Sequence, residues 1–126
     1  MPATYRLDPE RRLVLTHSWG VLTDREVRDL YESIRTDPVF EPTFRQLCDL
    51  RDVTQITASA DTLRDLARSH IFADGTRRAF VVARDVDYGM SRLFQAYVVP
   101  GAVLEVFRDM EKAELWLGLR VSTPTA

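Results

Sequence analysis

The start of the chain has a pattern typical of a β-hairpin. Residues 5–7 and 13–19 are strand-like, and between them Pro9 suits the second position of a tight turn. We therefore predict that the fold begins with two antiparallel strands.

Four later segments carry apolar residues three and four positions apart, as on one face of a helix. Thr23 and Glu26 form a capping-box pattern, in which each side chain accepts a hydrogen bond from the other's backbone N–H, so the first helix is predicted over 24–35. Ser59 is predicted to cap the second helix. The other inward stripes are expected to be Leu63, Leu66, Ala67, His70 and Ile71, then Val86, Met90, Leu93, Phe94 and Tyr97, and, after a cap at Asp109, Met110, Ala113, Trp116 and Leu117.

Three short apolar segments, 45–50, 79–83 and 104–107, have the length of buried strands and lie between the helices. Alternation of strand and helix predicts parallel strands joined by right-handed crossovers, with helices covering the sheet. The expected fold class is α/β, with a mostly parallel five-stranded sheet and an antiparallel N-terminal edge strand. The 126 residues are expected to form one domain with a frayed tail at 122–126.

Composition excludes several classes of partner. The chain has 17 Lys+Arg and 19 Asp+Glu, a formal net charge of −2, and no long basic tract, so nucleic-acid binding is not expected. No apolar run is long enough to span a membrane, and the N-terminus lacks the apolar core of a signal peptide. The single cysteine, Cys48, is predicted to be a buried, inert thiol, and the absence of disulfides favours a cytoplasmic protein.

No group of residues indicates catalysis, a metal site or a cofactor. Asp49 and Asp52 are three positions apart at a strand end and are therefore predicted to point to different faces. His17 and His70 have no second imidazole within four positions, so a metal would need ligands from distant segments. We therefore expect a non-enzymatic protein that uses no cofactor.

The carboxyl ends of the parallel strands are the expected ligand-binding rim, because ligands of open α/β sheets bind there. Guanidinium groups near helix N-termini could form an anion pocket, with the Tyr88 ring as a flat wall. The alternative is that Arg92 pairs with Asp85, Asp87 or another acidic residue and fixes a helix to a loop. Gly89 beside them suggests close approach of a neighbour or a ligand. The candidate ligand residues are Arg51, Arg84, Tyr88, Arg92 and Arg108.

Four stretches, spread over nearly the whole chain, are similar in order and spacing to those of one family. They are 19–24, 45–53, 88–94 and 106–109, the last followed by Ala113, Trp116 and Leu117. On these stretches the chain resembles the SpoIIAA-like group of STAS-type domains, particularly the small stand-alone bacterial STAS/SEC14-like proteins. The resemblance implies a four-unit β/α superhelix with an extra N-terminal strand, and a role in regulation or ligand sensing.

Ser59 takes on a second interpretation from this resemblance. In anti-sigma-factor antagonists of the STAS type, an Asp-Ser-Ser-Gly turn is phosphorylated on its second serine, which corresponds to Ser59. A phosphate there would meet free N–H groups and the positive end of the helix dipole. This chain reads Thr57-Ala58-Ser59-Ala60 and lacks the Asp and the Gly. Ser59 is thus either a phosphoacceptor or a helix cap alone.

Two functions are consistent with these patterns. One is a regulatory or protein-interaction module that docks another protein or itself, through an exposed patch near the second and third helices. The other is a carrier or sensor of an anionic or amphipathic small ligand at the carboxyl ends of the strands.

Overall fold

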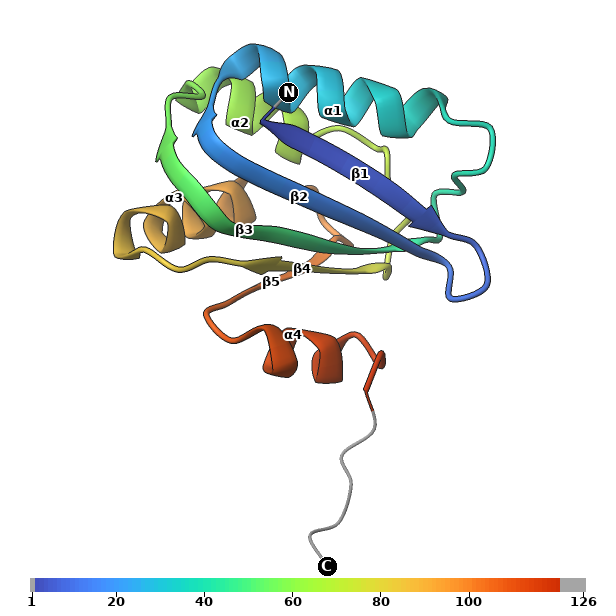
Figure 1. The fold of residues 1–126 in the computed structure, drawn as a ribbon. Helices are drawn as coiled ribbons and strands as arrows, with labels where there is room; N and C mark the ends of the chain where they lie inside the picture. The colour runs from blue at the N-terminus through green and yellow to red at the C-terminus, as the bar shows by residue number, and fades with distance from the viewer. Residues whose placement is uncertain (1, 121–126) are drawn as a thin grey trace, which may run out of the picture.

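The computed structural model describes residues 2–120, which form one five-stranded sheet and four helices (Figure 1). The tail at 122–126, expected to fray, lies outside these residues. The strands are β1 (Ala3–Asp8), β2 (Leu13–Leu22), β3 (Arg45–Ile56), β4 (Arg77–Val81) and β5 (Val103–Phe107). The helices are α1 (Asp24–Thr36), α2 (Ala60–Ala67), α3 (Asp85–Tyr97) and α4 (Met110–Trp116).

The strands lie in the sheet in the order in which they follow one another along the chain, β1-β2-β3-β4-β5. The β1–β2 pair is antiparallel and the other three pairs are parallel, so the predicted fold class is confirmed. Helices α1, α2 and α3 connect successive parallel strands and lie on one face of the sheet, which we call the helix face (Figure 1). Helix α4 follows the last strand and lies on the opposite face.

The main core fills the space between the sheet and helices α1 to α3. It is built from alternate strand positions, which point to one face, and from the inward stripes of the helices. Its most buried members include Val53, Ala67, Val82, Phe94 and Leu104. A one-residue shift in register would turn the apolar side chains of a strand to the other face of the sheet. Burial of these side chains therefore fixes the register of each strand.

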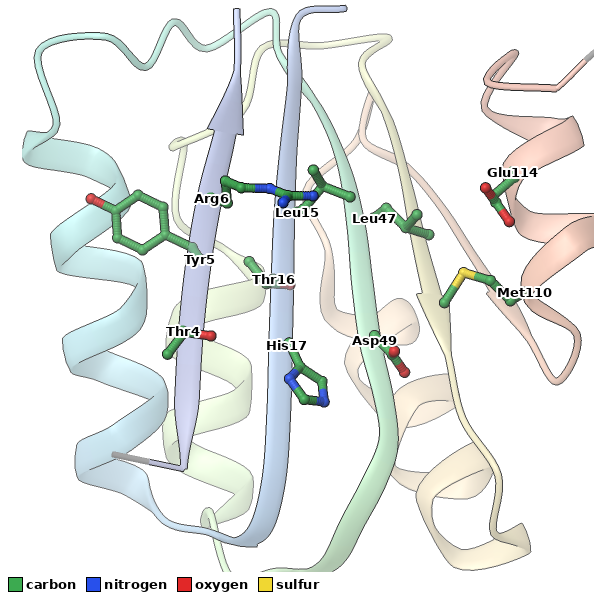
Figure 2. Close-up of a pocket in the computed structure, with 10 residues that line it drawn as sticks. All are labelled: Thr4, Tyr5, Arg6, Leu15, Thr16, His17, Leu47, Asp49, Met110 and Glu114. Atoms are coloured by element: carbon green, nitrogen blue, oxygen red, sulfur yellow. The ribbon is translucent and has the colours of Figure 1, made fainter.

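Helix α4 covers only part of the opposite face. Ala113 and Leu117 pack with Leu13, Leu47 and Ala79 in a smaller cluster, and the helix contacts strands β4 and β5. Over β1, β2 and the adjoining part of β3 no helix lies on this side (Figures 1 and 2). We call this uncovered surface the open face.

The capping-box prediction at the start of α1 is half confirmed. The Thr23 hydroxyl accepts a hydrogen bond from the Glu26 backbone N–H at 3.4 Å. The expected bond in return is absent, since Glu26 Oε2 is buried and has no partner among residues 2–120. The cap therefore rests on the hydroxyl alone.

Two predicted helix faces need correction. Helix α2 ends at Ala67, so His70 and Ile71 lie beyond it and not on its stripe. In α3 the buried positions are Asp87, Ser91 and Phe94, whereas Val86 is 59% exposed. Phe94 is buried and Met90 and Tyr97 pack against the core as predicted, so the prediction is wrong at Val86, and the first turn of α3 buries Asp87 instead, paired with Arg84.

Candidate interaction site on the open sheet face

The rim arginines do not form a free anion pocket. Arg84 donates to both oxygens of Asp87, from Nε at 2.8 Å and Nη2 at 2.9 Å, and also to the Thr54 carbonyl. Arg51 makes a similar two-pronged contact with Asp49, at 2.9 Å from Nε and from Nη2. Both guanidinium groups therefore already bind carboxylates of the same chain.

The other three candidate residues of the rim are Tyr88, Arg92 and Arg108. The Arg108 guanidinium lies 4.7 Å from the centre of the Tyr88 ring and donates to Asp85 at 2.6 Å. Arg92 is exposed and has no hydrogen bond or ion pair with any residue the structure describes, so the alternative pairing with Asp85 or Asp87 is wrong. Of the predicted rim, only Tyr88 and Arg108 are brought into contact with each other.

Ser59 is a helix cap in this structure. Its hydroxyl accepts from the Thr62 backbone N–H at 3.2 Å, and its own N–H donates to Asp24 Oδ1 at 2.6 Å. The hydrogen bond from Ser59 lowers the pKa of Asp24. A phosphate on Ser59 would therefore face an ionised carboxylate next to it. The Ser59 side chain is exposed, and its phosphorylation stays a prediction.

The open face contains a shallow groove of about 470 Å³ between the sheet and α4, which we call the open-face groove (Figure 2). Leu15 and Leu47 form an apolar floor, and Met110 extends toward it from α4. Arg6 lies on the β1 side and Glu114 on the α4 side. The full lining is Thr4, Tyr5, Arg6, Leu15, Thr16, His17, Leu47, Asp49, Met110 and Glu114.

A bulge between β2 and β3 gathers charged groups at one end of the groove. His17 lies opposite Asp49, but Trp19 lies opposite Asp52, so β3 contains one extra residue there. The bulge lets Asp52 reach Nε2 of His17 at 2.8 Å. The prediction that Asp49 and Asp52 point away from each other is therefore wrong, because the extra residue reverses the alternation of faces.

Asp49 is the carboxylate of an ion pair with Arg51. Burial raises the pKa of Asp49, but hydrogen bonds from the Arg51 side chain and backbone N–H outweigh it, and the net shift is downward. The guanidinium also lies in the field of Asp52 and Glu114. Arg51 thus lies among three carboxylates at this end of the groove.

Exposed apolar side chains adjoin the same end of the groove. Trp19 is 36% exposed and packs against His17, with 5.3 Å between the ring centres. Val21, two residues further along β2, is 44% exposed. Among the large apolar residues exposed in the described chain, only Val86 belongs to α2 or α3. The patch predicted near those helices is therefore not found there.

Other potential chemistry is not assembled. Within residues 2–120, no three His, Cys, Asp or Glu side chains are placed to hold a metal ion. Cys48 is buried, and burial raises the pKa of its thiol to about 11. None of the helices in that range is long and apolar enough to cross a bilayer.

Sequence reasoning missed the open-face groove for one reason. The alternation of β2 places Leu15, His17 and Trp19 on one face, and this arrangement can be inferred from the sequence. Which face the helices leave bare depends on where α4 packs, and no local pattern gives that. The mixed character of the stripe, with aromatic rings among aliphatic residues, was the available signal.

Comparison with known proteins bears on the fold. Neither protein-family models nor curated protein sequences give a match. One similar solved structure is an uncharacterised protein of the DUF3478 family, with a SpoIIAA-like fold, from Shewanella loihica PV-4. It is 19% identical, the alignment covers 91% of each chain, and the TM-score is 0.58. Together with the sheet order, this likeness shows that the chain has the SpoIIAA-like fold expected from its resemblance to STAS-type domains.

Proposed function

We propose that this protein is a non-catalytic interaction module that binds an amphipathic helix of a partner protein in the open-face groove. The observation that carries the proposal is the uncovered side of the parallel β2–β3 pair, where Trp19 and Val21 are exposed. A regulatory role in the cytoplasm is part of this proposal.

The parallel strands beneath the open-face groove favour an additional element that covers them. Parallel sheets occur almost always with both faces buried, because their crossovers and neighbouring elements shield them. Here α4 lies over β4 and β5 and packs against Leu13 and Leu47, and it leaves the rest of β1 to β3 uncovered on that side. Three strands about 4.8 Å apart span roughly the 10 Å diameter of a helix, so one more helix would complete the layer.

The lining specifies the chemistry of that helix. Leu15, Leu47 and Met110 would contact an apolar stripe, as in other helix-in-groove complexes. Arg6 has no ion pair among the described residues and would accept an acidic side chain at one edge of the stripe. Glu114, across the groove, already pairs with Arg120 at 3.1 Å and would tolerate a basic side chain there.

The strand ends do not favour the alternative function, a carrier of an anionic or amphipathic small ligand. Its candidate arginines Arg51, Arg84 and Arg108 already bind carboxylates, and displacing these would cost an ion pair each.

The test compares three forms of the protein. Leu15→Glu places a charge on the apolar floor, while Val86→Glu makes the same change at an exposed position on α3 outside the groove. Proteins captured by the wild type and by Val86→Glu, but not by Leu15→Glu, are identified. Synthetic peptides of their amphipathic helices are then titrated into the labelled protein and followed by NMR.

The expected result is that one such helix shifts the amides of Leu15, His17 and Leu47 and binds at least about tenfold more weakly to Leu15→Glu. Equal capture by all three forms, or shifts confined to another face, would reject the proposal. A second copy of this chain as the only partner would replace the helix with self-association.

A further inference from the structure

The outer edge of β1 is open to a further strand. β1 is the first strand of the sheet and pairs only with β2, in a register without a bulge. The Pro2 carbonyl accepts from the Trp19 N–H directly opposite, and in an antiparallel pair such hydrogen-bonded positions alternate with positions whose backbone points away from the partner. The backbone N–H and C=O groups of Ala3, Tyr5 and Leu7 therefore point outward. They have no hydrogen-bond partner within residues 2–120.

The edge strand on the other side of the sheet, β5, is partly blocked. The Phe107 carbonyl faces β4, where it accepts from the Val82 N–H, so the alternation turns the backbone of Leu104 to the outer edge. There the Gln95 side chain of α3 donates to the Leu104 carbonyl. Unpaired strand edges invite pairing with another chain. Of the two edges, β1 is therefore the one that offers a continuous row of free backbone groups.

A groove lies beside the free edge of β1, between this strand and α1, and we call it the edge groove. Its volume is about 490 Å³. Its lining includes Ala3 and Tyr5 of β1 and Glu26, Leu30 and Ser33 of α1. Helix α1 extends sideways beyond β1 (Figure 2). A strand added to β1, about 4.8 Å further out, would thus lie over α1 and turn every second side chain toward the edge groove.

Glu26 is the acidic side chain of the edge groove that has no partner. It takes part in no ion pair formed within residues 2–120. Its oxygen Oε2 is buried without a hydrogen bond, whereas Oε1, also without one in this range, is not buried and so touches accessible space. The other charged residues of the lining, Arg25 and Asp29, form an ion pair at 3.7 Å. The groove therefore contains one carboxyl group that lacks a basic partner.

This carboxyl group lies toward the Ala3 end of β1. Strand β1 and helix α1 both run opposite to β2, since α1 returns the chain to the start of the parallel strand β3. The Tyr5 hydroxyl donates to Asp37 Oδ2 at 2.7 Å, at the C-terminal end of α1. Ala3, two positions earlier, is therefore nearer the first turn of α1, which contains Glu26. Because its side chain is a single methyl group, it leaves room for a long side chain from an added strand.

We infer that β1 pairs with an extended segment of a partner protein, which places a Lys or Arg side chain in the edge groove against Glu26. The backbone of the segment pairs with Ala3, Tyr5 and Leu7. In strand addition, main-chain hydrogen bonds give affinity and alternate side chains give specificity. A basic group on the segment supplies the charge-assisted hydrogen bond that the carboxyl group lacks. This site is separate from the open-face groove and does not depend on the proposed function.

A second copy of this chain does not suit the same edge. Antiparallel pairing of two β1 strands about a twofold axis would place both α1 helices on one side of the joined sheet. Each α1 extends beyond its own β1 toward the other copy, so the two helices would compete for the same space (Figure 2). A single extended segment brings no such helix.

The probe is a displayed library of octapeptides in which Thr alternates with randomised positions. Thr favours an extended backbone, and alternate positions of a strand face the same side. Peptides selected by the wild type are expected to carry Lys or Arg at one randomised position. Titration of a selected peptide into the labelled protein should give saturable NMR shifts at the amides of Ala3, Tyr5 and Leu7.

Glu26→Gln keeps the shape of the side chain without its charge and should bind the selected peptide roughly tenfold more weakly. The matched control is Glu10→Gln, the same change at an exposed position outside the groove, which should bind like the wild type. Ala3→Pro removes an outward N–H at an edge where proline is tolerated, and it should also weaken binding. If Glu26→Gln does not fold, replacing the basic residue of the peptide by Met tests the same contact on the wild type.

Leu15→Glu, which alters the open-face groove, should bind the selected peptide like the wild type, so failure of this inference can be told apart from failure of the proposed function. Failure to select any peptide, or selection of peptides without a basic residue, would overturn the inference. Equal affinity of the wild type and Glu26→Gln, or shifts at Leu15 and Leu47 in place of β1, would do the same.

Discussion

Asp87 receives two hydrogen bonds from Arg84, at 2.8 and 2.9 Å, although its carboxylate is only 1% exposed. The pair spans the first turn of α3, so it joins the end of β4 to the helix. A carboxylate buried this deeply requires its partner, because a lone buried charge is strongly unfavourable. This relationship explains why Arg84 is not available to a ligand.

Arg84→Gln should lower the free energy of unfolding by about 2–3 kcal/mol, since it leaves the buried Asp87 carboxylate without its partner. Adding Asp87→Asn should recover part of that loss, because the neutral amide needs no counter-ion. Urea denaturation measures both changes. Arg92→Gln, an unpaired surface position on the same helix, should stay within about 0.5 kcal/mol of the wild type. Equal effects of Arg84→Gln and Arg92→Gln would show that the pair is not stabilising.

Cys48 should make stability fall at alkaline pH. Burial raises the pKa of the folded thiol to about 11, whereas its ordinary value is 9.0. The unfolded thiol therefore ionises first, so the contribution is fully present below pH 9 and is lost as pH rises to 11. The loss should approach about 3 kcal/mol. Urea denaturation at a series of pH values, compared with Cys48→Ala, isolates it; parallel curves for the two proteins would contradict the assignment.

Ser59→Ala should destabilise the protein by about 1 kcal/mol, because the Thr62 N–H loses its acceptor at the start of α2. Ser59→Asn keeps a capping oxygen and should remain within a few tenths of a kcal/mol of the wild type. Thermal or urea unfolding measures the difference. If both substitutions cost the same, the hydroxyl serves something other than the cap.

Gly89→Ala should stabilise the protein by about 1 kcal/mol, since Gly89 lies inside α3 and a Cβ there would meet no atom within 4 Å. No residue in the range 2–120 therefore makes the close approach that the sequence suggested for a neighbour, and close approach of a ligand stays a prediction. Gly101→Ala is the opposite case, because φ is +93° and the new Cβ would lie 2.8 Å from Asp74 Cγ. Urea denaturation should separate the two in sign. Loss of stability at Gly89 would indicate a neighbour that the structure does not describe.

The fold was predictable because its signals are local. Helix caps at Thr23, Ser59 and Asp109 depend on side chains within three residues of the N–H groups they bind. The apolar strand 79–83 and its neighbours set the parallel order in the same way. Residues that alternate by two or recur by about 3.6 carry this information in short windows.

The sites were not predictable because they depend on contacts between distant segments. Arg78 comes directly before the apolar segment 79–83 in the sequence, but its partners Gln46 and Tyr31 lie 32 and 47 positions away. The bulge opposite His17 reversed the expected direction of Asp52. Both depend on strand register, which the pattern of a single strand does not contain.

The consecutive strand order makes the two sides of the sheet different in kind. Helices α1, α2 and α3 each connect two neighbouring strands, so none of them can be deleted without breaking the connection between those strands. The other layer is a single segment of seven residues that follows the last strand. The position or sequence of α4 can therefore change without altering how the strands are connected. The side of the sheet that carries α4 can vary in its surface, while the side that carries α1 to α3 preserves the fold.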